Sequence, residues 1–186
     1  MPLVYLTGIS GSGKSEALKE LRRRGYEVHG TDEDGIAAYF DNQTGEALVN
    51  PPATAAERTP EWRQRHTWKM KREQVEAIVP SQPDRLVFLC GCTANEDEMW
   101  DLFAGVIALV VDEDTLVHRI KTRTNNNFGQ VDHEMAAILE WQGYAEADYR
   151  KHGVTTIDST RPISTVVDDV VEMAETLTGM RAPDLS

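Results

Sequence analysis

Eight residues near the start of the chain have the types and spacing of a phosphate-binding loop. They are Gly8-Ile9-Ser10-Gly11-Ser12-Gly13-Lys14-Ser15, which match the pattern G-x-x-x-x-G-K-[ST] in full. The glycines allow backbone conformations with positive φ, so that successive N–H groups can surround an anion. Lys14 is expected to contact the β- and γ-phosphates of ATP, and the Ser15 hydroxyl to bind Mg²⁺. Further nucleotide contacts are expected from residues of the same loop: Gly8, Ser10, Gly11, Ser12 and Gly13.

The segments on either side of the loop support this interpretation. Residues 3–6 form an apolar run of strand length, and residues 14–24 place Ala17, Leu18 and Leu21 on one face of a predicted helix. A strand before the loop and a helix after it are the context that the motif requires. The alternative is an ordinary glycine-rich turn that binds no ligand; the complete motif and its placement favour a ligand.

An acidic run follows the next predicted strand, residues 26–30. It reads Thr31-Asp32-Glu33-Asp34-Gly35. Phosphoryl transfer needs one group that orients the attacking hydroxyl and accepts its proton, and a carboxylate does both. The run therefore supplies candidate carboxylates for this role. The alternative is a solvated loop or a cap for the next helix.

Apolar runs of strand length alternate with segments of helical spacing along the chain. Strands are expected at residues 3–6, 26–30, 86–90, 106–111 and 154–157, and helices at 14–24, 113–123, 132–151 and 166–177. This alternation predicts an α/β fold with a five-stranded parallel sheet and helices on both faces, in a single domain over residues 1–186. A frayed tail is expected after Gly179.

Residues 36–79 depart from this alternation and are expected to form an insertion. Thr59 and Pro60 predict the start of a helix that continues to about residue 79. A hairpin or wide turn is expected between residues 38–40 and 46–49. Aromatic side chains here either bind an acceptor or pack on the core. The candidate acceptor contacts are Trp62, Arg65 and His66.

Charge and composition argue against several partners. The 186 residues include 19 Lys and Arg against 31 Asp and Glu, a formal net charge of −12. Nucleic acids and anionic membranes both require a basic surface, so neither partner is expected. No apolar stretch approaches the roughly 20 residues of a membrane helix, and no basic leader precedes the first strand, so a cytoplasmic location is expected. No feature predicts an oligomeric state.

Two segments of the second half carry residues with a recognisable spacing. Residues 116–123, Leu-Val-His-Arg-Ile-Lys-Thr-Arg, are similar to the adenylate kinase segment L-V-x-R-I-x-x-R, which enters the lid. Asp158-Ser159-Thr160-Arg161-Pro162 resembles the loop that holds the adenine edge in the same family. From residue 3 to about residue 177, the chain resembles the small P-loop kinases that include adenylate kinase and shikimate kinase.

The resemblance implies a lid over residues 119–131. In it, Arg119 would lie on the adenine ring and Arg123 would contact the phosphates, while Arg161 would be a further nucleotide contact. A guanidinium suits these roles because it stacks on aromatic rings and donates a fork of hydrogen bonds to phosphoryl oxygens. The alternative is a solvated helix face with scattered positive charge.

The acceptor side resembles shikimate kinases instead. Asp32 and Asp34 are similar to their D-x-D motif, in which the first carboxylate touches the acceptor hydroxyl and magnesium-bound water. Gly91 stands where a glycine-rich turn follows the third strand of the sheet in that family. No Asp ends this strand, so Mg²⁺ would rest mainly on Ser15, phosphates and water.

These features predict an ATP- and Mg²⁺-dependent phosphotransferase that acts on a small-molecule hydroxyl or phosphate acceptor. The alternative is a P-loop ATPase or regulatory nucleotide-binding module that acts through a protein partner. The candidate catalytic residues are Lys14, Asp32 and Arg123; the candidate metal residues are Ser15, Asp32 and Asp34; the candidate acceptor residues are Asp32, Asp34, Arg65 and Gly91.

Overall fold

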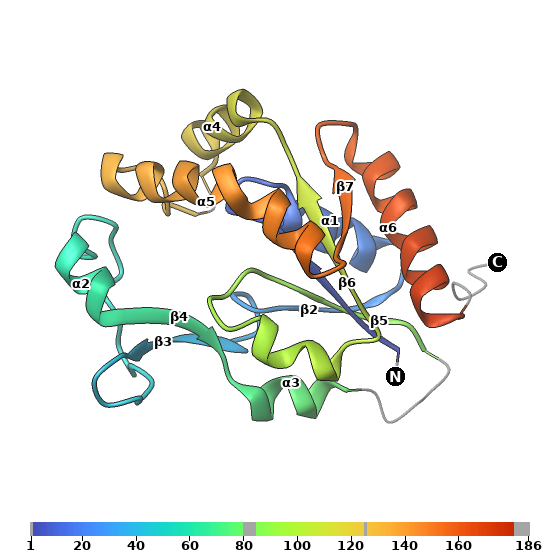
Figure 1. Cartoon of the computed structure of the whole chain (residues 1–186), viewed down its shortest axis with the longest axis horizontal. Coiled ribbons are helices and arrows are strands. Elements are labelled where there is room, and N and C mark those ends of the chain that lie inside the picture. Colours follow the sequence, from blue (N-terminus) through green and yellow to red (C-terminus); the bar gives the residue numbers. More distant parts are fainter. Residues whose placement is uncertain (1, 80–84, 125, 181–186) are drawn as a thin grey trace.

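The central sheet has five parallel strands, as predicted. The computed structural model describes residues 2–79, 85–124 and 126–180. In the sheet the strands lie in the order β2-β5-β1-β6-β7, so the first strand in sequence occupies the centre (Figure 1). The bounds are β1 Leu3–Thr7, β2 Glu27–Gly30, β5 Val87–Cys90, β6 Gly105–Val110 and β7 Thr155–Asp158.

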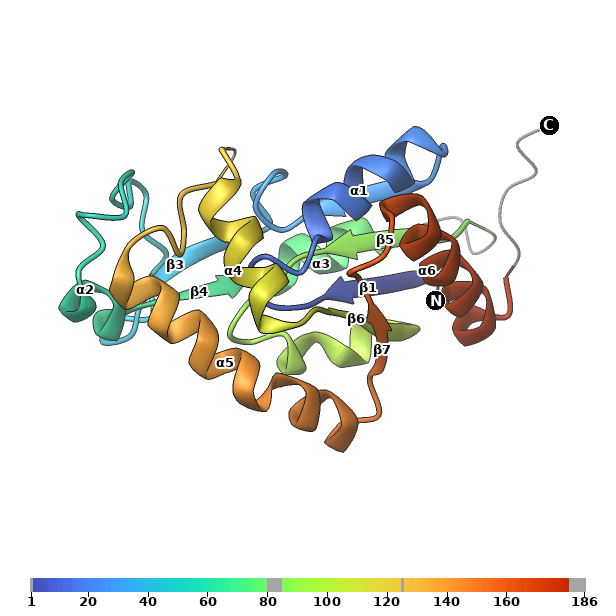
Figure 2. The same ribbon diagram turned by 90° about the horizontal axis from the view of Figure 1, so that it is seen from above.

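Side chains that alternate along β1 pack into the two layers of helices. Val4 and Leu6 lie in one core cluster with α1 (Lys14–Arg23) and α6 (Ile163–Thr178). Leu3 and Tyr5 lie in the other, with α3 (Arg72–Ile78) and the 3₁₀ helix η1 (Asp97–Leu102). All four side chains are fully buried, because a central parallel strand is covered on both faces (Figure 2).

Two further helices follow β6 and cover the end of the sheet next to the phosphate-binding loop. They are α4 (Glu113–Thr122) and α5 (Asp132–Lys151), close to their predicted bounds. Asp112 caps α4, since its carboxylate accepts a hydrogen bond from the Thr115 N–H at 2.8 Å. Leu116, Ile120 and Ile138 pack α4 against α5 in a third core cluster.

The insertion contains a two-stranded antiparallel sheet, which corrects one prediction. The long helix expected from Thr59 to about residue 79 is wrong: α2 (Pro60–Arg65) ends after six residues, and the chain continues as β4 (His66–Met70) before α3. Thr59 does cap α2, since its hydroxyl accepts from the Trp62 N–H at 3.3 Å. The strand forms because aromatic and β-branched side chains of β4 pair with β3 (Ala37–Asp41), where Tyr39 lies opposite Trp68.

The hairpin or wide turn expected between residues 38–40 and 46–49 is present as a narrow turn after β3. A bridge joins Phe40 to Ala47, and the Leu48 N–H donates to the Tyr39 carbonyl at 2.8 Å, while the other edge of β3 pairs along its length with β4. Asp41 closes the turn that follows β3, because its carboxylate accepts from the Gln43 N–H at 2.8 Å. The insertion therefore projects from the main sheet as a β-hairpin that carries α2 (Figure 1).

The carboxyl-terminal helix ends as its sequence suggests. Gly179 has a φ of 68° and donates to the Glu175 carbonyl at 2.8 Å, which stops α6. The tail expected to fray beyond it lies, from residue 181 onward, outside the described residues. Within the described part of the chain, no helix is long and apolar enough to cross a membrane.

Candidate functional site

The phosphate-binding loop joins the central strand to α1. Gly8, Gly11 and Gly13 have φ angles of 136°, 90° and 101°, so all three need the conformational freedom of glycine. A side chain at position 8 would also collide with the Leu109 carbonyl. The Lys14 ammonium lies back over the loop and donates to the carbonyls of Gly8 and Ile9, the latter at 2.9 Å.

Two arginines of the α4 segment reach the same loop. Arg119 donates from Nη1 to the Ser12 carbonyl at 3.4 Å, and from Nη2 to the Ser159 carbonyl at 2.7 Å. Arg123 donates from Nη2 to the Ser10 hydroxyl at 3.0 Å and to the Phe128 carbonyl. Burial lowers the pKa of Arg123, and the nearby Glu134 carboxylate opposes that effect. The structure thus brings Arg119 and Arg123, both expected to belong to a lid, against the loop that carries Lys14.

The loop after β7 also lies beside the phosphate-binding loop. The Ser159 hydroxyl, which is buried, donates to the Ser12 carbonyl at 2.6 Å. Arg161 takes a different direction, since its described partners are the Asp158 carbonyl and the Asp169 carboxylate of α6. The segment is therefore placed next to the loop, whereas the Arg161 side chain lies along α6.

The acidic turn after β2 separates its carboxylates. Asp32 is exposed and accepts from its neighbour Thr31 at 3.0 Å. The Asp34 Oδ2 atom accepts from the Gly30 N–H at 2.7 Å and pairs with Arg22 at 2.9 Å. Among the described residues, Asp32 takes part in no ion pair within 4.0 Å, so its charge is available at the carboxyl edge of the sheet.

Gly91 and Arg65 occupy different surroundings. Gly91 follows β5 and donates to the Leu6 carbonyl at 3.1 Å, and a side chain at position 91 would collide with the side chain of Thr31. Glycine is therefore required there for packing between two loops at the edge of the sheet. Arg65 ends α2 and pairs with Asp41 at 2.9 Å, with 54% of its side chain exposed.

Sequence reasoning missed a carboxylate behind the phosphate-binding loop. Glu96 accepts from the Tyr5 hydroxyl at 3.0 Å and from the Thr7 hydroxyl at 2.9 Å, and Thr7 directly precedes Gly8. Burial raises the pKa of Glu96, and these hydrogen bonds, together with the Lys14 charge, oppose the rise. The spacing of Thr93 and Glu96 resembles that of an exposed capping box, which conceals the half-buried position of the carboxylate.

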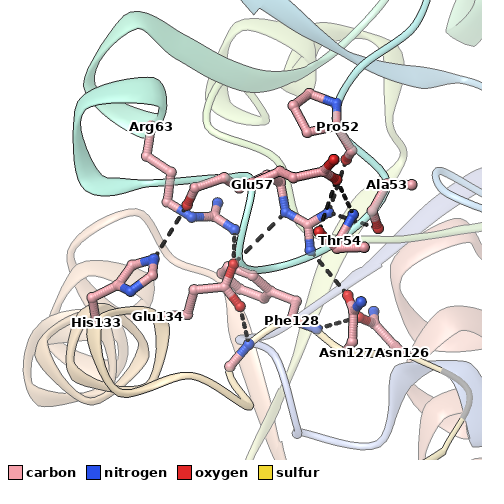
Figure 3. Close-up of polar contacts among 12 residues, drawn as sticks. Pro52, Ala53, Thr54, Glu57, Arg63, Asn126, Asn127, Phe128, His133 and Glu134 are labelled. Carbon is pink, nitrogen blue, oxygen red and sulfur yellow. Dashed lines mark hydrogen bonds and ion pairs between the residues drawn. The ribbon is translucent and has the colours of Figure 1, made fainter.

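A second missed feature is a buried ionic cluster between the insertion and the segment after α4 (Figure 3). Glu134, in the first turn of α5, is fully buried and pairs with Arg63 and with Arg58, the latter at 3.7 Å. Its other oxygen accepts from the Gly129 N–H at 2.6 Å. Arg63 and Glu134 are 71 positions apart in the sequence, so no local spacing reveals the cluster.

A profile of one protein family covers most of the chain. The profile of the AAA domain matches residues 4–140. The chain belongs to the AAA domain family. No curated protein matches this AAA domain.

Solved structures match this chain over nearly its whole length. The shikimate kinase from Acinetobacter baumannii in complex with shikimate has a TM-score of 0.59 and 17% identity, over 95% of this chain and 94% of that one. The shikimate kinase from Bacteroides thetaiotaomicron has a TM-score of 0.57 and 16% identity, over 93% and 98%. A sugar kinase from Janibacter sp. HTCC2649 has a TM-score of 0.51 and 14% identity, over 98% and 99%. The chain thus has the fold of the small P-loop kinases, which confirms the predicted fold and resemblance.

Proposed function

We propose that this protein transfers the γ-phosphate of ATP to a hydroxyl or phosphate group of a small molecule. The observation that carries the proposal is the convergence of Lys14, Arg119 and Arg123 on one glycine-rich loop. The chain as a whole has a net charge of −12, so three cations around one loop form a local site for a polyanion. Such a site stabilises the charge that phosphoryl transfer spreads over the phosphate oxygens.

The residues around the loop fit a nucleoside triphosphate. Glycines with positive φ expose backbone N–H groups, and α1 directs its positive end toward the same space. Lys14 would leave the loop carbonyls for the β- and γ-phosphates, while Arg119 would contact the base and Arg123 the phosphates. We propose the loop residues Gly8, Ser10, Gly11, Ser12 and Gly13 as the remaining phosphate contacts, with Arg161 as a peripheral one.

Magnesium fits this site only with help from the nucleotide. Among the described residues, no three His, Cys, Asp or Glu side chains are grouped to hold a metal ion. Ser15 would supply a hydroxyl and Asp32 a carboxylate, whereas Asp34 would act through the oxygen that Gly30 and Arg22 do not hold. Bound Mg²⁺ would neutralise charge on the phosphates.

The acceptor would bind at the carboxyl edge of β2 and β5. There, Asp32 would orient the acceptor hydroxyl and accept its proton. Gly91 would line the floor, where its lack of a side chain lets the Thr31 side chain pack directly against the backbone. We propose that residues 36–79, with Arg65, cover the acceptor, and that residues 119–131 form the lid over the nucleotide.

The competing function is an ATPase or regulatory module that acts through a protein partner. It is favoured by the sequence after β5, where Cys90-Gly91-Cys92 leaves no carboxylate directly at the strand end. Measuring ATP consumption with and without a panel of polyols, sugars, nucleosides and nucleoside monophosphates tests the proposal. We expect consumption that depends on one acceptor class; consumption at the same rate without any acceptor would contradict a phosphotransferase.

A further inference from the structure

The buried cluster of Arg58, Arg63 and Glu134 joins two segments that the proposed function assigns to different ligands. Both arginines belong to the insertion on the acceptor side, and Glu134 begins α5 just after the lid. Arg58 is only 7% exposed and Glu134 is fully buried. A buried carboxylate is costly without a cationic partner, so at least one of the two arginines must stay with Glu134.

The same cluster holds three consecutive lid residues. Arg58 donates from Nη2 to the Asn127 side chain at 2.9 Å, and the Arg63 guanidinium lies 4.7 Å from the centre of the Phe128 ring. Glu134 accepts from the Gly129 N–H at 2.6 Å (Figure 3). The cluster therefore contacts the amide side chain of Asn127, the ring of Phe128 and the backbone N–H of Gly129, which are consecutive residues of the proposed lid.

The lid residue Phe128 connects this cluster to the phosphate-binding loop. Its ring lies under Arg63, and its carbonyl accepts from Arg123, which also donates to the Ser10 hydroxyl. A continuous series of contacts thus runs from the insertion through the lid to the loop. When Arg123 moves toward phosphates, Phe128 must either follow it or lose the contact.

The arginines of this series have unused hydrogen-bonding capacity. The Nε atoms of Arg58, Arg63 and Arg123 are all buried and make no hydrogen bond within the described residues. Buried donors without hydrogen bonds are unfavourable, so an arrangement that gave these atoms acceptors would gain free energy. Coupling between two sites needs an element with two discrete arrangements. This series of contacts is tight in the arrangement described here, and its unbonded donors could find acceptors in another.

We propose that Glu134 is a positioning residue that couples nucleotide binding at the loop to ordering of the acceptor-side insertion. It acts through Arg63, Phe128 and Arg123, and it touches neither ligand. The inference rests on nucleotide binding at the loop, which is part of the proposed function. Coupling of this kind is reciprocal, so an acceptor that orders the insertion would in turn tighten the binding of ATP.

Hydrogen–deuterium exchange on the full chain tests the coupling. The wild type is measured first, with and without a non-hydrolysable ATP analogue and Mg²⁺, on peptides that cover residues 52–65 and 126–135. We expect the analogue to slow exchange in both regions, by roughly fivefold or more in residues 52–65. Binding of the analogue is measured in parallel by calorimetry.

Two variants interrupt the series, and one serves as control. In Glu134→Gln and in Arg63→Met, the analogue should still bind and slow exchange in the phosphate-binding loop, but it should no longer slow exchange in residues 52–65. Arg63→Met leaves Arg58 paired with Glu134, so it provides the test if Glu134→Gln does not fold. Arg72→Met is the control, because this exposed arginine of the insertion pairs with Glu76 and Asp101 and should respond like the wild type.

Each result decides between the two claims. If the wild type binds no nucleotide, both the proposed function and the coupling are overturned. If the wild type binds and either folded variant still transmits protection to residues 52–65, the coupling is overturned while the proposed function stands. Loss of protection in Glu134→Gln and Arg63→Met, with protection retained in Arg72→Met, supports Glu134 as the positioning residue.

Discussion

At the scale of single residues, the contacts of Lys14 connect the loop's shape to its proposed chemistry. Its ammonium is held by the carbonyls of Gly8 and Ile9 in the space that the glycines open. Carbonyl dipoles hold an ammonium less strongly than phosphates do, because a carbonyl oxygen carries a partial negative charge and a phosphate carries full negative charges. Phosphates are therefore expected to displace these contacts.

Replacing Lys14 by Ala should remove ATP turnover while leaving the fold intact. The loop keeps its glycines, but the γ-phosphate loses the charge that stabilises its transfer, so kcat/KM should fall at least roughly 100-fold. Turnover is measured by a coupled ADP assay. Lys19→Ala removes an equal charge from an exposed pair with Glu16 and should change nothing; full activity of Lys14→Ala would refute the role of the loop.

Asp32→Asn should separate catalysis from nucleotide binding. An amide still accepts hydrogen bonds but takes no proton, so turnover should fall by about 100-fold or more with ATP affinity nearly unchanged. Calorimetry gives the affinity and a coupled assay gives the rate. Asp168→Asn, which removes an exposed carboxylate on α6, is the matched control. Unchanged turnover in Asp32→Asn would show that another group orients the acceptor.

Glu96 gives a prediction for the pH dependence of stability. Burial holds its pKa in the folded protein above the ordinary value of 4.5, so its ionisation lowers stability as pH rises from that value through the folded-state pKa. Glu96→Gln stays neutral and keeps an acceptor for Tyr5 and Thr7. Urea unfolding at several pH values should show the variant gaining stability relative to the wild type as pH rises. A parallel pH dependence would contradict the burial effect.

At the scale of elements, the sequence predicts the strands of the main sheet and most helices, but not the insertion. Residues 86–90 are apolar on both faces of the predicted strand. This pattern is typical of a strand that is covered on both sides in a parallel sheet. Residues 66–70 follow a capped helix start, and no glycine or proline separates them from it. The local sequence therefore favours a helix that continues through them. Pairing with β3, a contact between distant residues, decides for a strand.

The edge of the sheet at Gly91 gives a prediction about packing. In Gly91→Ala, the new methyl group meets the side chain of Thr31, so the free energy of unfolding should fall by about 1–3 kcal/mol. Gly143→Ala is the matched control, because this glycine lies in α5 with open space around it. The control should gain about 0.5–1 kcal/mol from helix propensity. Urea denaturation measures both, and equal stability of the two variants would contradict the packing.

At the scale of the whole molecule, the net negative charge and the three cations at the phosphate-binding loop have opposite effects on anions. An acidic surface repels polyanions in general, whereas the loop with Lys14, Arg119 and Arg123 gathers positive charge in one place, where we expect the proposed nucleotide to bind. The phosphate-binding loop, Arg119 and Arg123 could be named as candidates from the sequence because each lies in a local motif, and their roles stay predictions. The cluster around Glu134 could not be named in this way, because its members come from segments that only the fold brings together.

The fate of the γ-phosphate tests the central claim most directly. ATP labelled at its γ-phosphate is incubated with the protein and the acceptor panel, and the products are separated. The account predicts label on one class of organic acceptor, only when that acceptor is present, and none with Lys14→Ala. Label that appears solely as inorganic phosphate, at the same rate with and without acceptors, would contradict it.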